Sequence, residues 1–374
     1  MHKINPLVLF GLLIVAPGCS KNSPAPTTAV FHPQFVFNSS GELLLAWCEE
    51  HESGANLFLA SGDDKNQVSN RVGVNHLAGM VNSSSFDELR PSIAVAAGGL
   101  LAIGFTDKNW DVRVAISRDG GQTFESAIKL NQDTTHAMQS FVSVAFDSEG
   151  SLHGVWIDPR EAPPRQEEPC DLYYAHLQNG NAGEQNLTAG QIASVCGCCR
   201  PCLAYGNDGR FEVLFRNTDA AGYRDIYRVA KSSAGEFSHP ARIGPALWKI
   251  AGCPAAGPVA VNGWTLWNDG STGAMRLLAL ADSKELPETV LRSDETWAIN
   301  GSPRPVKTQD QSGALVLVPG TPTGKIMRLE NNSWKMAIAD IPEWCRDAAL
   351  HNGELRLLGT TEGKLEMEIR PISL

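Results

Sequence analysis

Four of the nine cysteines in this chain lie within seven residues, at Cys196, Cys198, Cys199 and Cys202. A further cysteine, Cys253, stands between a glycine and a proline downstream. Thiols at this density bind soft metal ions, form disulfides or carry out redox chemistry. The sequence therefore places its most evident chemistry here, and we call Cys196, Cys198, Cys199 and Cys253 the cysteine cluster.

Three interpretations of the cysteine cluster stay open at this point. In the first, a structural disulfide joins Cys253 to Cys196, Cys198 or Cys199, which is the commonest use of cysteine in exported proteins. In the second, the four thiolates bind Cu(I) or Zn²⁺. In the third, a disulfide joins the adjacent residues Cys198 and Cys199 and is redox-active.

The N-terminus indicates export. Lys3 precedes an apolar run from Leu7 to Val15, which is too short to span a membrane. The following residues resemble a bacterial lipobox, so we expect a signal peptide over residues 1–18, lipidation of Cys19 and a tether over residues 19–29. The protein would then be lipid-anchored in the bacterial cell envelope, facing the periplasm or at the outer membrane. Its other eight cysteines would fold under oxidising conditions.

The composition is that of a globular protein, with 43% hydrophobic and 19% charged residues. The formal net charge is −10 and the sequence has no basic run, which argues against nucleic acid as a partner. We expect a monomer.

Internal repeats predict the fold. The stretch 248–254 shares Trp, Ile, Gly and Pro at matched positions with the stretch 297–303. Hydrophobic runs also end repeatedly in an aromatic residue, any residue and an acid, as at Trp47–Glu49 and Trp156–Asp158. A proline precedes such aromatics by 14 residues at Pro33, Pro91 and Pro201. Repeats near this length are typical of propellers and solenoids.

These marks divide the chain into seven units of short strands. Inner strands are expected to start near Gln34, Pro91, Ser140, Pro201, Pro254, Pro303 and Asp347. We therefore predict an all-β protein with one β-propeller domain over residues 30–374, made of four-stranded antiparallel blades. We count seven blades, or six if one terminal unit is vestigial. The last unit lacks an evident fourth strand, and residues 27–31 are expected to supply it and close the ring.

The stretch Ser117–Phe124 resembles the Asp box of the sialidase and BNR-repeat propellers, a turn between the third and fourth strands of a blade. A wider part of the chain, about residues 87–270, is similar to bacterial envelope proteins generally labelled exo-α-sialidase-like. The stretches that carry this similarity are Arg90–Pro91, Trp156–Arg160, Cys196–Cys199, Tyr223–Ile226 and Trp248–Pro254.

The resemblance implies that the protein binds or hydrolyses acidic glycans. Sialidases of this fold bind the substrate carboxylate with three arginines; Arg90 fits the first position, and the candidate partners are Arg200, Arg304 and Arg346. Their tyrosine nucleophile has no counterpart here, because no tyrosine follows Tyr227 and only Tyr223 could substitute for it. Asp158 and Arg160 are further candidates: the carboxylates of Asp158 and Glu161, which flank Arg160, could serve as acid and base, or the group forms an inter-blade salt bridge.

In a propeller the inner strands begin around one end of the central channel, where ligands bind. This arrangement adds His32 and His136 to the candidate ligand-binding residues. Three functions stay open: a glycan-directed envelope lipoprotein, whose catalysis is unproven; a periplasmic metal or redox protein built on the cysteine cluster; and a scaffold for an envelope partner. No cofactor is certain, and copper or zinc at the cysteine cluster is the candidate.

Overall fold

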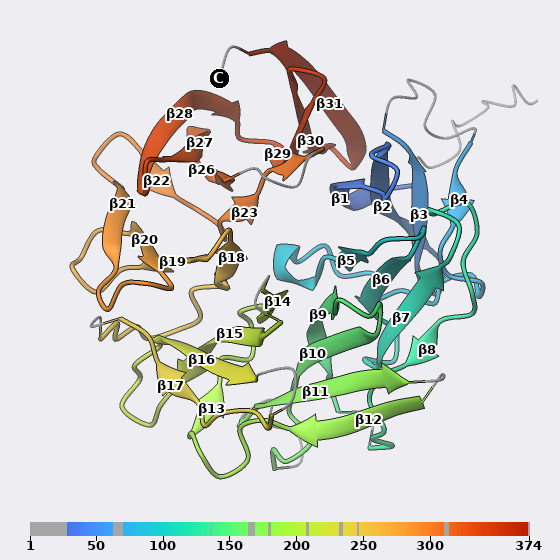
Figure 1. Cartoon of the computed structure of the whole chain (residues 1–374), viewed down its shortest axis with the longest axis horizontal. Helices are drawn as coiled ribbons and strands as arrows, with labels where there is room; N and C mark the ends of the chain where they lie inside the picture. Colours follow the sequence, from blue (N-terminus) through green and yellow to red (C-terminus); the bar gives the residue numbers. More distant parts are fainter. Residues whose placement is uncertain are drawn as a thin grey trace, which may run out of the picture.

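Seven mainly antiparallel sheets stand around a central axis in the computed structural model, which describes residues 28–62, 70–135, 137–163, 169–178, 181–206, 209–231, 235–244, 247–309 and 314–372. The protein is an all-β, seven-bladed propeller with mainly four-stranded blades, so the predicted fold and the count of seven are confirmed (Figure 1). Cys19 and His136 lie outside the described residues.

The first four blades follow one another along the chain. Blade 1 contains β1 (Val30–Phe37), β2 (Leu43–His51), β3 (Gly54–Ser61) and β4 (Val72–Gly73). Blade 2 contains β5 (Ser92–Val95), β6 (Leu101–Thr106), β7 (Val112–Ser117) and β8 (Ile128–Lys129). Blade 3 contains β9 (Ser140–Phe146), β10 (Leu152–Asp158), β11 (Asp171–Gln178) and β12 (Asn181–Asn186). Blade 4 contains β13 (Ser194–Val195), β14 (Cys202–Tyr205), β15 (Phe211–Thr218), β16 (Ile226–Lys231) and β17 (Ala241–Arg242).

The last three blades complete the ring. Blade 5 contains β18 (Val259–Val261), β19 (Trp264–Asp269), β20 (Arg276–Ala281) and β21 (Glu288–Arg292). Blade 6 contains β23 (Arg304–Pro305), β25 (Leu315–Val318), β27 (Thr323–Glu330) and β28 (Ser333–Pro342), with β22 (Ala298–Ile299) and β26 (Gly320–Thr321) paired beside it. Blade 7 contains β24 (Lys307–Thr308), β29 (Cys345–His351), β30 (Glu354–Thr361) and β31 (Lys364–Pro371).

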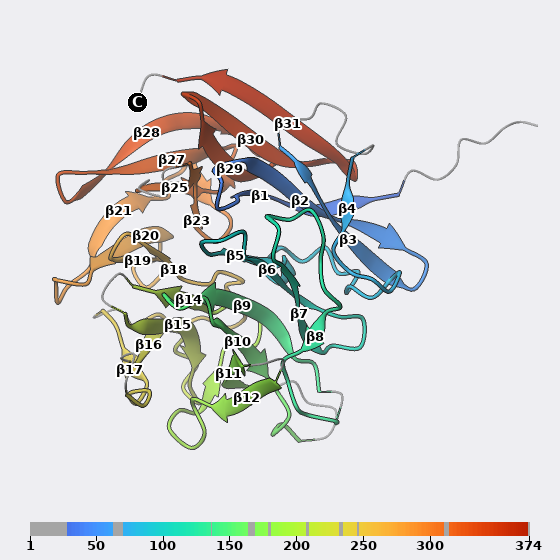
Figure 2. The same cartoon turned by 45° about the vertical axis from the view of Figure 1, so that its right-hand side comes forward.

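Ring closure differs from the prediction for residues 27–31. The segment from Val30 onward is the inner strand β1 of blade 1 and pairs with β2, so it does not complete the last blade. Blade 7 instead gains its innermost strand from β24, which runs parallel to β29. Blades 1 and 7 pack side by side (Figure 2), and the Val30 amide donates a hydrogen bond of 2.8 Å to the Gly363 carbonyl. The N-terminal strand is hydrophobic on both faces, which favours an inner position over an edge.

The aromatic-x-acid repeat has a direct physical role in two of the blades. The Trp47 indole donates a hydrogen bond of 2.9 Å to Glu49, and the Trp156 indole donates one of 3.0 Å to Asp158. Both tryptophans are fully buried, so the acid two residues later satisfies an indole N–H that water cannot reach. The repeat thus fixes a large core side chain at the end of the second strand.

A second repeated contact explains the match between residues 248–254 and 297–303. Trp248 lies against Gly270, and Trp297 lies against Gly320 in the next blade. A Cβ atom at Gly320 would come within 2.6 Å of the Trp297 ring, so the position requires glycine. The same tryptophan–glycine packing therefore recurs in blades 5 and 6.

The turn from β7 to β8 is held by side chains of the Asp-box-like stretch. Thr123 Oγ1 donates to Asp119 at 2.6 Å, and the Gly121 amide donates to Ser117 Oγ at 2.8 Å. Hydrogen bonds from Thr123 and Ser117 lower the pKa of Asp119 to about 2. Phe124 is buried in the core of blades 1 and 2. This stretch therefore stabilises the blade.

Across the residues that the structure describes, the helical element is a 3₁₀ turn, η1 (Asp87–Leu89). It lies near the axis of the ring in Figure 1, where inner strands of several blades converge. No helix among the described residues is long and apolar enough to cross a membrane.

Candidate functional site

The cysteine cluster joins two neighbouring blades. Cys196, Cys198 and Cys199 lie in the loop between β13 and β14 of blade 4, and Cys253 lies in the loop that leads to β18 of blade 5. A disulfide links Cys198 to Cys253, with their Cα atoms 6.5 Å apart. The predicted link from Cys253 to the 196–199 loop is therefore present, and the alternative pairing of Cys198 with Cys199 is not.

The sulfurs of Cys196 and Cys199 lie next to this disulfide on its buried side. Cys196 Sγ is 3.6 Å from Cys198 Sγ and 3.5 Å from Cys199 Sγ. All four sulfurs of the cluster lie within 4.8 Å of one another. Cys196 and Cys199 are fully buried, whereas Cys253 is exposed and Cys198 half-buried. The cluster therefore has an accessible outer pair and a protected inner pair.

Arg224 gives the cluster its charge. Its Nη1 atom donates to Cys196 Sγ at 3.0 Å. The hydrogen bond shared with Cys199 lowers the pKa of the Cys196 thiol to about 6; burial opposes this shift and Arg224 adds to it. Burial raises the pKa of Cys199 well above its usual value. The pKa values of the two inner thiols are therefore shifted in opposite directions, and Cys196 is the more acidic of the pair.

Backbone amides and a second arginine shape the loop that carries Cys253. The Ala255 amide donates to Cys253 Sγ at 3.2 Å, and the Ala256 amide donates to Cys199 Sγ at 3.4 Å. Arg216 is 1% exposed and donates to the carbonyls of Ala256 and Asn268 at 2.9–3.2 Å. Arg216 therefore ties blade 4 to the loop and blade 5, which holds the two halves of the cluster in register.

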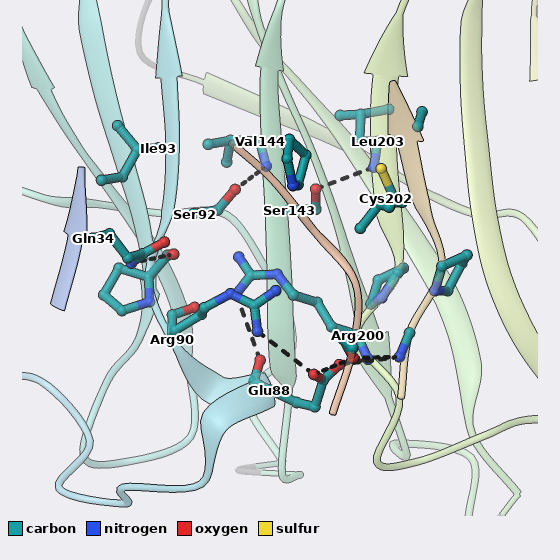
Figure 3. Close-up of a pocket in the computed structure, with 18 of the residues that line it drawn as sticks. Gln34, Glu88, Arg90, Ser92, Ile93, Ser143, Val144, Arg200, Cys202 and Leu203 are labelled. Atoms are coloured by element: carbon teal, nitrogen blue, oxygen red, sulfur yellow. Dashed lines mark hydrogen bonds and ion pairs between the residues drawn. The ribbon is translucent and has the colours of Figure 1, made fainter. Parts of the chain in front are cut away.

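A buried carboxylate organises the neighbouring channel. Glu88 of η1 is 2% exposed and accepts hydrogen bonds from the Arg200 amide at 3.1 Å, the Gly257 amide at 3.3 Å and Ser302 Oγ at 2.6 Å. Arg90 Nη1 lies 3.5 Å from its other side (Figure 3). Glu88 therefore connects blades 2, 4, 5 and 6 at one point.

Of the predicted channel arginines, Arg200 and Arg304 lie beside Arg90 here, and their Nη groups bind carbonyls and an acid of the protein itself. Arg200 donates to the carbonyls of Glu88, Arg90 and Val142, the last at 2.6 Å. Burial lowers the pKa of Arg200 to about 9. Arg304 donates to Asp87 and to the Arg346 carbonyl. These side chains therefore connect neighbouring blades through hydrogen bonds inside the channel.

Asp87 and Arg90 complete this network. Arg90 Nη1 donates to the Asp87 carbonyl at 3.0 Å. Burial alone would raise the pKa of Asp87, but Arg304 and Arg90 outweigh it and hold that pKa below the usual range. The arginine charges are thus matched by Asp87 and Glu88, which the sequence analysis did not single out. Glu88 stands two residues before the Arg90–Pro91 step, and this proximity is the sequence signal that could have identified it.

A cavity of about 220 Å³ with a mixed polar and apolar lining lies beside Arg90 and Arg200 in the channel. Gln34, Ser92, Cys202 and Lys307 are among the residues around it. Gln34 donates to the Pro91 carbonyl at 3.0 Å and Ser92 Oγ accepts from the Val144 amide at 3.0 Å (Figure 3). These polar side chains of the cavity wall therefore also form hydrogen bonds between adjacent blades.

Among the remaining predicted residues, His32 lies close enough to Asp87, Arg90 and Arg304 for their charges to act on its ring, whereas Tyr223 and Arg346 make other contacts. His32 Nε2 is 2.9 Å from the Ser84 carbonyl, and burial lowers the pKa of His32 to about 4. The Tyr223 ring faces the Lys249 ammonium at 5.7 Å and does not line the channel cavity. The Arg346 guanidinium donates to the Glu343 carbonyl at 2.6 Å.

Asp158 and Arg160 form a salt bridge, but it lies within blade 3 and not between blades as predicted. Arg160 Nη2 contacts Asp158 Oδ2 at 2.5 Å, and its Nη1 contacts Glu184 at 2.5 Å. The corresponding acids Glu49, Asp107 and Asp269 each pair with an arginine as well. Because the pairing recurs in four blades, it belongs to the repeat.

No protein-family model matches the sequence, and no curated protein matches it either. Solved structures share the fold. Puromycin hydrolase aligns with a TM-score of 0.60 at 12% identity, over 92% of this chain and 52% of its own, so this chain spans about half of that protein. A PL25 ulvan lyase bound to a glucuronic-acid-containing oligosaccharide aligns with a TM-score of 0.50 at 9% identity, over 75% of this chain and 79% of its own.

The expected similarity to sialidases is distant. Trypanosoma rangeli sialidase aligns with a TM-score of 0.46 at 11% identity, over 83% of this chain and 54% of its own. Identities at this level establish the β-propeller and leave activity open. The fold is therefore one that glycan-active enzymes share with other propellers.

Proposed function

We propose that the protein, in its reduced form, binds one thiophilic metal ion, Cu(I) or Zn²⁺, in the cysteine cluster. The observation that supports this function is the convergence of four sulfurs from two blades within 4.8 Å. Reduction of the Cys198–Cys253 disulfide supplies the third and fourth thiols. Thiolates are the preferred protein ligands of Cu(I) and common ligands of Zn²⁺.

The spacing of the sulfurs fits such an ion. Zinc–sulfur bonds of about 2.3 Å in a tetrahedron place neighbouring sulfurs about 3.8 Å apart. Cys196 Sγ already lies 3.6 Å and 3.5 Å from Cys198 Sγ and Cys199 Sγ. Arg224 and the amides of Ala255 and Ala256 donate to cluster sulfurs, and such outer hydrogen bonds stabilise thiolate ligands. The exposed Cys253 gives the ion a path of entry.

Metal titration of the full exported protein tests this function. The reduced protein is titrated anaerobically with Cu(I) against bicinchoninate, and with Zn²⁺ against a chromogenic chelator. We expect one tightly bound ion per chain, and at least a tenfold loss of affinity when Cys196→Ser or Cys199→Ser removes a ligand.

Cys345→Ser is the matched control. Cys345 is also buried, but it is not one of the four sulfurs of the cluster. Its thiol donates to the Asp347 carbonyl, and a serine at this position can keep that hydrogen bond. This variant should bind metal as the wild type does. Binding that survives Cys196→Ser and Cys199→Ser, or a wild-type protein that competes for neither ion, would refute the proposal.

A glycan-directed function is the second candidate, supported by the channel cavity beside Arg90 and by a fold shared with an ulvan lyase. An acidic glycan would have to compete with Asp87 and Glu88 for the arginine donors, which is why we rank this function below metal binding. Turnover of a fluorogenic sialoside or uronide that Arg90→Ala abolishes would reverse this ranking.

A further inference from the structure

We propose that the cysteine cluster also carries out thiol–disulfide exchange, in which the disulfide moves from the outer pair, Cys198 and Cys253, to the inner pair, Cys196 and Cys199. This activity goes beyond metal binding, because it starts from the oxidised protein and requires no metal. Its external substrates are thiols, which can reach only the outer pair.

The geometry places a nucleophile against the disulfide. Cys196 Sγ lies 3.6 Å from the Cys198 sulfur, so attack requires no rearrangement of the blades. The Arg224 guanidinium, 3.0 Å from Cys196 Sγ, compensates negative charge on the attacking sulfur. On the other side, the Ala255 amide donates to Cys253 Sγ at 3.2 Å and stabilises the charge that this sulfur acquires as it leaves.

The first step transfers one bond. The Cys196 thiolate attacks Cys198 Sγ, a Cys196–Cys198 disulfide forms, the Cys198–Cys253 bond breaks, and Cys253 leaves as a thiolate. The electron pair of the broken bond stays on Cys253, which then takes up a proton from water. No oxidant or reductant is consumed.

The second step completes the transfer inward. Cys199 Sγ lies 3.5 Å from Cys196 Sγ, so the Cys199 thiol, once it has lost its proton to water, can attack Cys196 and displace Cys198 as a thiolate. The product has a buried Cys196–Cys199 disulfide and two accessible thiols. In the reverse direction, Cys198 attacks Cys196 and displaces Cys199, and Cys253 then attacks Cys198 and displaces Cys196, which restores the outer disulfide.

Exposure supports this division of roles. Cys196 and Cys199 are 0% exposed, so external thiols and alkylating reagents reach them poorly. Cys253 is exposed and Cys198 half-buried. Oxidising equivalents can therefore pass between solvent and the inner pair only through the outer sulfurs.

The test uses the oxidised full chain alone, in a metal chelator and with no external thiol. The native protein is incubated with iodoacetamide, quenched in acid, and its disulfides and modified cysteines are mapped by mass spectrometry. In the wild type we expect Cys253 to become alkylated over time, with a disulfide at Cys196 in the same molecules. Cys196→Ser should reduce the alkylation of Cys253 to background, and Cys345→Ser should leave it unchanged.

Three results would overturn the proposal. These are a wild-type Cys253 that stays unmodified, a Cys253 alkylated equally in the Cys196→Ser variant, and alkylated wild-type molecules without a disulfide at Cys196. The last result is read from the wild type alone, so it holds even if the variant fails to fold. Because a chelator is present and the protein is oxidised, the outcome is independent of whether the reduced protein binds Cu(I) or Zn²⁺.

Discussion

Glu88 carries one negative charge at the point where four blades meet. Its carboxylate accepts from the Arg200 amide, the Gly257 amide and Ser302 Oγ, and it pairs with Arg90. The charge is buried, and a buried charge is tolerated only when such partners satisfy it. At the scale of single residues, this junction positions Arg200 and the loop after Cys253, and so the cysteine cluster beside it.

We therefore expect Glu88→Ala to lower the free energy of unfolding by about 3 kcal/mol, because it removes the acceptor of the buried Arg200 amide and of the Ser302 hydroxyl and takes one carboxylate away from Arg90. Glu88→Gln keeps one acceptor oxygen and should lose less. Chemical denaturation followed by tryptophan fluorescence measures the loss, with the exposed Glu149→Ala as the control. Equal stability of the Glu88→Ala variant and the wild type would contradict this role.

Within the blades, strands β10 and β11 place two histidines face to face. The rings of His153 and His176 stack with centroids 4.3 Å apart and planes within 7°. His153 Nδ1 lies 2.6 Å from the Tyr174 hydroxyl and its Nε2 lies 3.1 Å from Asp147. A neutral imidazole satisfies both contacts, accepting from the tyrosine and donating to the aspartate. Burial lowers the pKa of His153 to about 4, against a partial rise from the bond to Asp147.

This shift predicts a pH dependence of stability. The unfolded chain protonates His153 near its ordinary pKa of about 6.5, whereas the folded chain holds it neutral down to about pH 4. The stabilisation is therefore complete above about pH 6.5 and is lost as the pH falls toward 4. Between pH 7 and pH 5 the wild type should lose on the order of 1–2 kcal/mol more unfolding free energy than His153→Gln.

Urea denaturation at several pH values measures this difference, and both proteins share all other titrating groups. His176, whose pKa burial also lowers, stays in both proteins. Parallel pH profiles for the wild type and His153→Gln would show that His153 does not contribute.

For the molecule as a whole, the ring is closed by strands that are distant in sequence. Blade 7 takes its innermost strand from β24, ahead of β25 in blade 6, and packs against β1. The disulfide and the Glu88 junction add cross-links between non-adjacent stretches of chain at one end of the ring. The two candidate activities therefore depend on the assembled propeller.

We propose that the propeller is anchored to the cell envelope through a lipid on Cys19. Cys19→Ser should then move the protein from the membrane fraction to the soluble fraction and abolish labelling with a radioactive or clickable fatty acid. Expression in a bacterial host with fractionation checks both outcomes, and Cys345→Ser serves as the control. A Cys19→Ser protein that stays in the membrane fraction would exclude this mode of anchoring.

The propeller fold could be predicted from repeated features of the amino-acid sequence. Several blades repeat features that act within one blade, such as the bond from the Trp156 indole to Asp158 or the packing of Trp297 on Gly320. The turn at Ser117–Phe124 is likewise closed by hydrogen bonds within its own residues. Short-range constraints of this kind leave a periodic trace in the sequence, so the fold and the number of blades could be predicted.

The tertiary structure decided the site. Whether Cys253 meets Cys196, Cys198 or Cys199 depends on the loop conformations of two blades, which Arg216 fixes through carbonyls that no side-chain pattern marks. The channel arginines were predicted to converge, but their donors bind backbone carbonyls and the acids of η1. Glu88 had little local signal, because its partners lie 112, 169 and 214 residues away along the chain. Interactions between distant residues leave no periodicity, so only the folded ring shows where they meet.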